Sequence, residues 1–361
     1  MESYILNGGK LLNKAIKKAQ SDGKNTLTIT DNYEIEETVL IPSHFHLILD
    51  NCRLRMADNT FCNLFRNEHA DDGIGDTAIR IEGRNGAVLD GGMYNGLSER
   101  SPKTPNQPPM TVQNLILFAN VSDFEVSGLS FYHQRWWAIN NYACHHGVFR
   151  NLHFEADDRR YIEDGTLVHK LDWDTPYANI YIHNADGIDI RRGCHDILIE
   201  NISGFTEDDT VACTLLHGDG EKQYVPENVC PDIHDIKIRH IHAAAFCSLV
   251  RLLSQSDGMM YNITVEDVIE CDDEVKAHMK RGLSALRIGD DTKYGDYPND
   301  ENRMHHITAT KIRSGGDFVV DLAGKMRDIT IDDYTAENAQ TQLLRSTADG
   351  TNIILCQQKA Q

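Results

Sequence analysis

Carboxylates recur at a short interval in the middle of the chain. Asp186 closes the tripeptide Asn184-Ala185-Asp186, and the pair Asp208-Asp209 begins 22 residues later. This interval is close to the repeat of the surrounding apolar pattern, so the three side chains could lie on neighbouring rungs of one β-surface, with backbones about 4.8 Å apart. Carboxyl groups that close cannot all be ionised at neutral pH, so the site would hold both an acid and a base. Enzymes that hydrolyse glycosidic bonds use such pairs of carboxyl groups as their catalytic residues.

A structural interpretation of the same residues competes with the catalytic one. Asp and Asn are favoured at turns because their side chains hydrogen-bond the nearby backbone. A row of them on a repetitive β-protein can therefore be a solvated ladder of turn caps. Spacing alone leaves both interpretations open.

One short apolar pattern recurs seven times and predicts the fold. Its copies are SDFEVSGLSF, HHGVFRNLHF, CHDILIENIS, IHDIKIRHIH, MYNITVEDVI, MHHITATKIR and MRDITIDDYT. Their first apolar residues are Phe124, Val148, Ile197, Ile236, Ile263, Ile307 and Ile329. Each copy alternates apolar and polar residues, which is the period of a β-strand. Successive copies are separated by the length of one coil or of about two coils. This recurrence predicts an all-β parallel β-helix of about ten coils. An antiparallel sandwich would not repeat the same phase so often.

The solenoid accounts for nearly the whole chain. Residues 9–20 place apolar side chains on one helical face, so residues 1–24 are expected to form an N-terminal cap over the first coil. A single β-helix domain then spans residues 25–361. Two polar interruptions, 101–109 and 155–178, are expected to be long loops that leave the coil stack.

Composition excludes some classes of function. The chain has 361 residues, 40% of them hydrophobic, and 35 Lys and Arg against 55 Asp and Glu give a net charge of −20. Nucleic-acid binding is not expected, because phosphate contacts need a basic surface. No leader or membrane-spanning run is visible, and the nine cysteines lack CxxC spacing. We therefore expect no membrane association and a cytoplasmic location, although a chain whose leader had been removed would look the same.

The segment around the carboxylates resembles glycoside hydrolase family 28, the polygalacturonase family. The family's Asn-Thr-Asp motif matches Asn184-Ala185-Asp186, and its Gly-Asp-Asp motif matches Glu207-Asp208-Asp209. The resemblance covers about residues 110–290. It implies a right-handed parallel β-helix that hydrolyses glycosidic bonds with inversion, with Asp208 as the general acid and two aspartates holding and deprotonating the attacking water. Inversion leads us to expect carboxyl groups about 6.5–9.5 Å apart.

The chain departs from the family pattern at two motifs. The family's Gly-His-Gly should fall at Phe246-Cys247-Ser248, where there is no histidine. Its Arg-Ile-Lys falls at Arg287-Ile288-Gly289, which keeps the arginine and loses the lysine. In the family these residues assist the aspartates and bind the uronate carboxylate. The departures therefore put polygalacturonate itself in doubt as the substrate.

Further residues are candidates for substrate contact. These are Asn184, His217, Arg251, Arg287 and Trp137. His217 could reach the cleft from a loop, or have no role. Arg251 could place a cation beside Asp208, or pair with a carboxylate of another rung. An exposed indole at Trp137 would offer a flat face to a sugar ring, although one of two adjacent tryptophans should point inward.

No metal and no cofactor are expected. The adjacent His145 and His146 should face opposite ways on a strand, and no third ligand stands at a suitable spacing. The favoured function is an inverting, exo-acting glycosidase on an oligosaccharide, with a uronic-acid-containing, pectin-derived one as one option. The alternatives are a β-helix lyase, epimerase or fructan transferase, and a non-catalytic carbohydrate-binding β-helix. The oligomeric state is not predicted.

Overall fold

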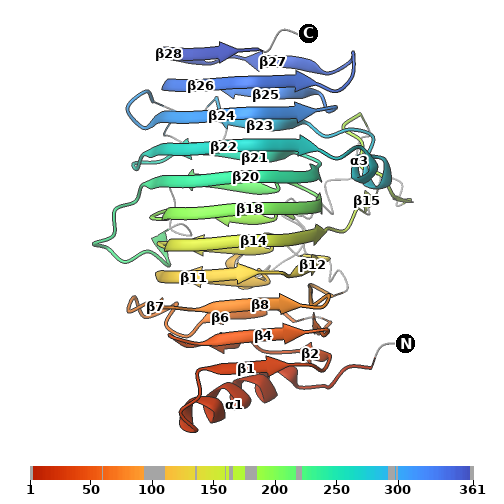
Figure 1. Cartoon of the computed structure of the whole chain (residues 1–361), viewed down its shortest axis with the longest axis vertical. Helices are drawn as coiled ribbons and strands as arrows, with labels where there is room; N and C mark the ends of the chain where they lie inside the picture. The colour runs from red at the N-terminus through yellow and green to blue at the C-terminus, as the bar shows by residue number, and fades with distance from the viewer. Residues whose placement is uncertain are drawn as a thin grey trace.

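The chain forms a stack of β-coils with a helix across its first coil (Figure 1). The computed structural model describes residues 3–58, 60–92, 110–134, 136–158, 160–161, 166–174, 185–216, 222–291, 297 and 300–357. Two large sheets of parallel strands run along the stack, and the two described ends of the chain lie at opposite ends of it (Figure 1). The parallel β-helix predicted from the repeats is confirmed.

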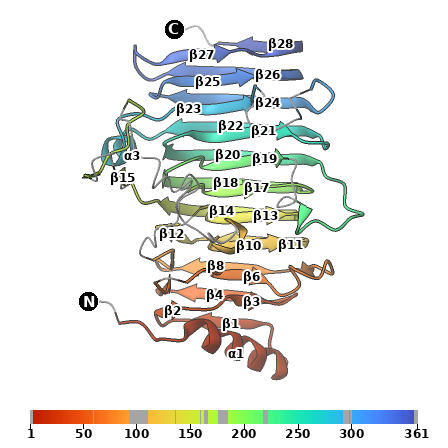
Figure 2. The same ribbon diagram turned by 180° about the vertical axis from the view of Figure 1, so that it is seen from behind.

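The sheet that carries the candidate site has ten strands and is called sheet B. The number of strands agrees with the expected ten or so coils. In spatial order from the N-terminal end, which is also chain order, its members are β3 (Val39–Ile41), β6 (Phe65–Asn67), β10 (Ile116–Ala119), β13 (Ile139–Tyr142), β17 (Ile188–Ile190), β19 (Val211–Leu216), β21 (Ser248–Gln255), β23 (Ser284–Gly289), β25 (Phe318–Ala323) and β27 (Gln342–Ser346). These strands are seen from the opposite side in Figure 2.

The second sheet, sheet A, has sixteen strands and includes the longest ones. Its members are β1 (Thr26–Ile29), β2 (Tyr33–Ile35), β4 (His46–Asp50), β5 (Arg53–Met56), β7 (Asp76–Thr77), β8 (Arg80–Arg84), β9 (Val88–Asp90), β11 (Val121–Ser127), β12 (Ser130–Tyr132), β14 (His145–Glu155), β18 (His195–Thr206), β20 (Ile233–Ala245), β22 (Met260–Glu270), β24 (Met304–Ser314), β26 (Lys325–Ala336) and β28 (Asp349–Cys356).

A column of left-handed residues explains the repeated phase of the sequence. One residue near the start of each long strand has a φ of 52° to 57°. Its members are Asp123, His146, Asp196, Asp235, Asn262, His306, Asp328 and Asn352. The parallel register passes over these positions, pairing Ser122 with His145 and then Phe124 with Gly147. Asn, Asp and His tolerate this conformation better than other non-glycine residues, so the same residue types recur wherever the coil bends.

The interior is a set of aligned apolar rows, and one of them corrects the predicted repeat. The isoleucines Ile197, Ile236, Ile263, Ile307 and Ile329 are register partners along sheet A and are buried. In the preceding coil the partner of Ile197 is Gly147, whereas Val148 was expected to occupy the row. A Cβ on Gly147 would lie 2.0 Å from the Phe124 ring, so the ring fills the place of the missing side chain.

The first coil is covered by α1 (Gly8–Ser21), as predicted for residues 9–20. Leu12, Ile16 and Ala19 enter the core, while Leu11, which was expected on the same face, is 43% exposed. The helix closes the open end of the apolar interior, which removes an exposed sheet edge.

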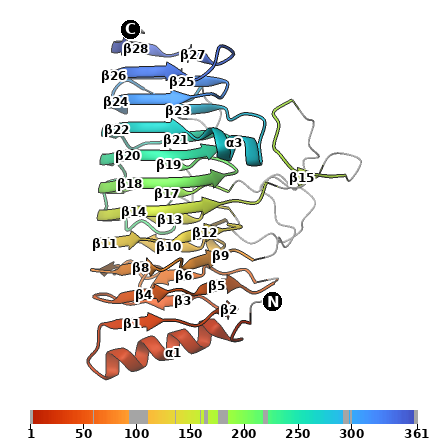
Figure 3. The same ribbon diagram turned by 45° about the vertical axis from the view of Figure 1, so that its right-hand side comes forward.

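Further elements lie between the coils. The helix α3 (Asp272–His278) was not predicted, and it projects from one edge of the stack together with the small antiparallel pair β15 (Arg160–Tyr161) and β16 (Leu167–Val168) (Figure 3). A short 3-10 turn, η1 (Met110–Val112), precedes β10. The predicted loop at 101–109 lies outside the described residues, as does part of 155–178. Within the described chain, no helix is both long and apolar enough to cross a bilayer.

Candidate active site

The three carboxylates predicted from the 22-residue interval come together in space. Asp186 and Asp209 each stand two residues before a strand of sheet B, and the register of β17 with β19 places them side by side. Asp208 adjoins them, and one carboxylate oxygen from each residue lies within 4.8 Å of the others. Asp186 is only 5% exposed, whereas Asp208 and Asp209 are partly exposed. The cluster therefore combines one buried acid with two that solvent can reach.

Backbone amides of successive coils orient two of these side chains. Asp186 Oδ1 accepts a hydrogen bond of 2.9 Å from the Asp209 amide. Asp209 Oδ1 accepts one of 2.8 Å from the Ser248 amide. Each carboxylate thus accepts a backbone hydrogen bond from the coil that follows its own, which fixes its direction.

Glu207 takes the place of the glycine expected before the aspartate pair. Its side chain is buried, and Oε2 accepts a hydrogen bond of 3.1 Å from the Ala185 amide. The bond joins the turn that carries Asp186 to the coil that carries Asp208 and Asp209. Ala185 and Glu207 are 22 residues apart, which is the same interval that relates Asp186 to Asp208. The interval could therefore have predicted this contact, but the sequence alone was not interpreted in that way.

Burial and mutual repulsion perturb the protonation of the cluster. The pKa of Asp186 lies well above its ordinary value, first because the carboxyl is buried and then because Asp189, Asp208 and Asp209 are close. Burial also raises the pKa of Asp209, while the charges of Arg251 and Arg287 oppose that rise. Asp186 and Asp209 therefore keep a proton above the pH where an isolated Asp would lose it.

A thiol and a hydroxyl occupy the place of the family histidine. Cys247 forms a side-chain hydrogen bond with Asp208, and the pKa of its thiol is raised well above the usual value by burial and by the charges of Asp208 and Asp209. Ser248 lies beside Asp209, and its hydroxyl accepts a hydrogen bond of 3.1 Å from Ser284. Neither side chain is a cation, so Cys247 and Ser248 do not supply the positive charge that a histidine at this place would supply.

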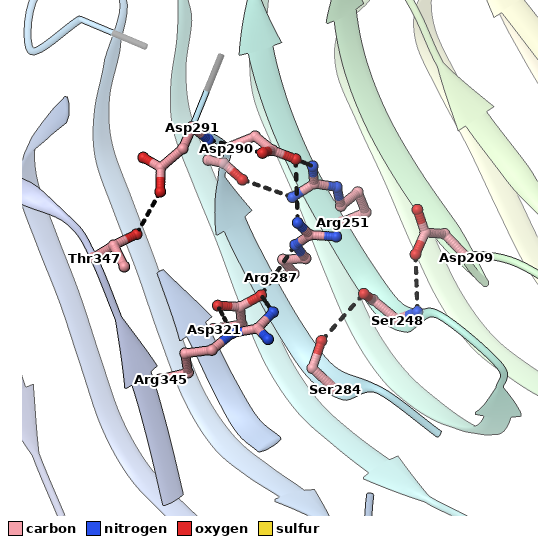
Figure 4. A network of polar contacts seen from close by, with 11 residues as sticks. Asp209, Ser248, Arg251, Ser284, Arg287, Asp290, Asp291, Asp321, Arg345 and Thr347 are labelled. Atoms are coloured by element: carbon pink, nitrogen blue, oxygen red, sulfur yellow. Dashed lines mark hydrogen bonds and ion pairs between the residues drawn. The ribbon is translucent and has the colours of Figure 1, made fainter. Parts of the chain in front are cut away.

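The two predicted arginines lie one above the other on the next coils. Arg251 of β21 and Arg287 of β23 are register partners, and both lie on the same side of sheet B as Asp209 (Figure 4). Arg251 was expected beside Asp208, but its charge acts on Asp209. It also forms an ion pair of 2.7 Å with Asp290, which is the alternative that the sequence left open.

Trp137 lies against the cluster but is covered. Its relative exposure is 5%, and the guanidinium carbon of Arg191 stands 3.8 Å from the centre of its ring. Arg191 in turn pairs with Asp189 at 2.7 Å. Asp189 and Arg191 were not singled out in the sequence, although they follow Asp186 directly. Contact between Trp137 and a substrate stays a prediction.

Two groups of described residues have donors close enough for a metal ion. One is the Asp186, Asp208 and Asp209 cluster, whose oxygens would suit a hard divalent cation. The other joins Glu155 to Glu274 and His278 beside α3. His145 and His146, expected to face opposite ways, instead have Nδ1 atoms 3.0 Å apart. Asn184 and His217 lie outside the described residues.

The carboxyl spacing differs from the expectation. The acid and base of an inverting glycosidase stand about 6.5–9.5 Å apart, and those of a retaining one about 5–5.5 Å. Here the closest oxygens of all three aspartates lie within 4.8 Å. The backbone bonds from Asp209 to Asp186 and from Ser248 to Asp209 draw adjacent coils together, which explains the shorter distance.

Comparison with solved structures identifies the fold. A hyperthermoactive exopolygalacturonase from Thermotoga maritima is similar with a TM-score of 0.57 and 12% identity, over 96% of this chain and 87% of that chain. A double mutant of the tailspike protein of E. coli bacteriophage HK620 is similar with a TM-score of 0.64 and 12% identity, over 96% and 61%. The chain is a β-helix protein. A second tailspike double mutant, in complex with a pentasaccharide, gives 0.63 and 11%, over 98% and 62%.

These similarities extend to the fold and no further. The chain spans less than two thirds of the tailspike chains. No model of a known protein family matches the sequence. No curated protein matches it either. The β-helix is thus shared with these structures at an identity of 11–12%.

Proposed function

We propose that this β-helix protein is a glycoside hydrolase that cleaves an oligosaccharide at the Asp186, Asp208 and Asp209 cluster. The observation that carries the proposal is the convergence of three carboxylate oxygens within 4.8 Å, one of them on a buried acid. Glycoside hydrolysis needs a proton donor and an ionised carboxylate in one site. Carboxyl groups this close cannot all be ionised, so a protonated carboxyl stands beside a charged one in this cluster.

Each aspartate has a role in the proposed reaction. Asp208 donates a proton to the leaving oxygen, as the family resemblance implies. Asp186 and Asp209 hold the water that attacks the anomeric carbon, and Asp209, whose ionised form the charges of Arg251 and Arg287 favour, takes up its proton. A water that donates to two acceptors at about 2.8 Å each bridges about 4.5 Å, which suits oxygens within 4.8 Å of each other.

The stereochemical course follows from which group attacks. A water held by Asp186 and Asp209 would invert the anomeric centre, whereas direct attack by a carboxylate would retain it. Proton NMR of the first product formed by the wild type distinguishes the α from the β anomer before mutarotation. We expect inversion, and retention would assign a nucleophilic role to one of the aspartates.

The test of the proposal is hydrolysis of defined neutral and uronic oligosaccharides of several lengths. Asp208→Asn should lower kcat by about 10²–10⁴-fold, because it removes the proton donor. Asp235→Asn is the matched control: Asp235 is a left-handed surface residue of sheet A, and Asn tolerates that conformation. Equal turnover by wild type and Asp208→Asn, with unchanged melting temperature, would contradict the assignment. Release of single end units from longer chains is expected for exo-action.

A non-catalytic carbohydrate-binding protein is the second candidate. Cys247 in place of the expected histidine favours it, because a thiol bonded to Asp208 supplies no positive charge there. Binding without hydrolysis across the whole oligosaccharide panel would support this candidate over the enzyme. Turnover that disappears with EDTA and returns with Ca²⁺ would point to a metal at the aspartates and to a lyase.

A further inference from the structure

A ladder of charged side chains continues from the aspartate cluster along sheet B. The register of β21, β23, β25 and β27 aligns Arg251, Arg287, Asp321 and Arg345 in one row. Asp209 and Ser248 lie at one end of the group, and Arg345 and Thr347 lie at the other (Figure 4). An oligosaccharide bound at the aspartates and extending toward the C-terminal coils would lie on this row.

Every guanidinium of the row is engaged by a carboxylate of the protein itself. Arg251 Nη2 stands 2.7 Å from Asp290 Oδ2, and its Nη1 donates to the Gly289 carbonyl at 2.7 Å. Arg287 Nη2 stands 3.1 Å from the same Asp290 oxygen, and its Nε stands 3.0 Å from Asp321 Oδ2.

Arg345 completes the row in the same way. It donates two hydrogen bonds to Asp321, of 2.9 Å and 2.6 Å. Its guanidinium carbon also lies 4.1 Å from the centre of the Phe318 ring. Two carboxylates, those of Asp290 and Asp321, thus engage three guanidinium groups.

The carboxylates that engage the arginines are buried. The side chains of Asp290 and Asp321 are 7% and 3% exposed, and that of Arg251 is 4% exposed. Separating such a pair leaves a desolvated charge without its partner, which is strongly unfavourable. A uronate carboxylate could take the arginine donors that these pairs use only by displacing Asp290 or Asp321.

The charge balance of the surface adds to this effect. The row and the aspartate cluster together hold three guanidinium groups and the five carboxyl groups of Asp186, Asp208, Asp209, Asp290 and Asp321. Among the described residues, this row therefore repels an anionic sugar and presents no guanidinium without a carboxylate partner. A sugar hydroxyl, by contrast, both donates and accepts hydrogen bonds, so it fits a row in which Arg donors alternate with Asp acceptors.

An apolar face lies next to the start of the row. Trp173 stacks on Phe246 with ring centres 4.2 Å apart. Phe246 stands two residues before Ser248 in the chain. Trp173 is 40% exposed, so part of its ring is open to a ligand. An exposed indole beside hydrogen-bonding groups suits the apolar face of a sugar ring.

We propose that Asp290 and Asp321 are specificity-determining residues that occupy the arginines of sheet B, so that the bound oligosaccharide is a neutral one and not a uronic one. This inference rests on the proposed function for the position of the ligand. It names the substrate class for that site and explains why the arginine of the Arg-Ile-Lys match remains while uronate recognition is lost.

The experiment measures binding with Asp208→Asn protein, which is expected to hold a substrate without cleaving it. The probes are matched pairs, each made of a uronic oligosaccharide and the neutral sugar obtained from it by carboxyl reduction, across several linkages. Isothermal titration calorimetry should give a Kd at least tenfold lower for the neutral member. Tighter binding of the uronic member, or binding of neither member in every pair, would overturn the proposal.

Substitutions then test the two aspartates directly. Asp321→Asn in the same background removes the carboxylate that engages Arg345 and the Nε of Arg287, and it should shift the ratio of the two Kd values at least tenfold toward the uronic member. Glu200→Gln is the matched control, because Glu200 also accepts two hydrogen bonds from one arginine, Arg239, but on sheet A. An unchanged ratio in a folded Asp321→Asn protein would refute the role. Asp290→Asn replaces that variant if its melting temperature shows that it does not fold.

Failure of this inference and failure of the proposed function give different results. Wild-type hydrolysis of uronic but not neutral sugars would overturn the specificity assignment and keep the glycosidase. Neutral sugars that bind with the expected preference but are never hydrolysed would overturn the glycosidase and keep the binding specificity.

Discussion

The outer faces of sheet A and sheet B carry the same kinds of charged residues in different surroundings. Along β20 of sheet A, buried and exposed residues alternate for most of the strand, as expected when one face packs on the core and the other meets solvent. Along β21 of sheet B, every residue is buried. The residues of β21, Arg251 among them, therefore hold their side chains away from water.

Two carboxylates, one from each face, are perturbed in opposite directions. On sheet A the hydrogen bond from His195 lowers the pKa of Asp196 below its ordinary value. On sheet B burial and nearby carboxylates raise the pKa of Asp186. Charges on sheet A thus favour the folded state at neutral pH, whereas ionisation of Asp186 opposes it. Destabilised groups gathered at one place are typical of functional sites.

The largest expected difference between the two sheet faces is in the free energy of unfolding that is lost when an ion pair is broken. Arg251→Ala removes the closer of the two arginines that pair with the buried Asp290 and should lower the free energy of unfolding by about 3–5 kcal/mol. Arg239→Ala breaks the Arg239–Glu200 pair of sheet A, whose arginine is 34% exposed, and should cost about 1 kcal/mol or less. Urea denaturation of both variants measures the difference, and equal losses would remove the energetic distinction between the faces.

The next effect concerns a buried contact that positions the cluster. Glu207→Ala removes the acceptor for the Ala185 amide, so the turn that carries Asp186 should loosen and kcat should fall about tenfold to a hundredfold. KM should change less, and Glu207→Gln, which keeps an oxygen acceptor, should restore most of the activity.

Glu200→Ala on sheet A provides the comparison for this variant. It removes a glutamate that accepts hydrogen bonds from Arg239 but lies on the other sheet, so its kcat should equal that of the wild type. If Glu207→Ala lowers only the melting temperature and leaves kcat unchanged, Glu207 has a structural role alone.

The smallest effect is in the dependence of stability on pH. Because the folded-state pKa of Asp186 is raised, its ionisation lowers stability as pH rises above the unfolded value of about 3.9. Asp186→Asn should therefore melt a few degrees above the wild type at pH 7, with the difference shrinking toward pH 4. Melting curves from pH 4 to 8 measure it.

Substitution of Asp196 should change the melting temperature in the opposite direction. Its folded-state pKa is lowered, so it stabilises the protein above the unfolded value and loses that contribution as pH falls through the folded value. Asp196→Asn should melt slightly below the wild type at pH 7 and equal it in acid. The same sign for both substitutions would contradict the contrast between the faces.

The sequence was sufficient for the architecture because a solenoid repeats its constraints. Each coil needs an apolar row inside and a left-handed residue where the strand bends. The pairs Asp235-Ile236 and Asn262-Ile263 therefore occupy the same position in two successive coils. The helix α3 was missed because it occurs once. Its acidic first turn, Asp272 to Glu274, and the basic Lys276 in its last turn were the available signals.

The sequence by itself determined that Asp186, Asp208 and Asp209 would meet, since an interval of one coil places residues on adjacent rungs whatever surrounds them. Only the tertiary structure decided how each is bound and charged, because that depends on residues from several coils. The Ser248 amide orients Asp209, Glu207 holds the turn of Asp186, and Asp290 and Asp321 engage the arginines that a linear motif would have left free. Spacing along the chain specifies neighbours in a solenoid, whereas burial and charge compensation come from the packed coils together.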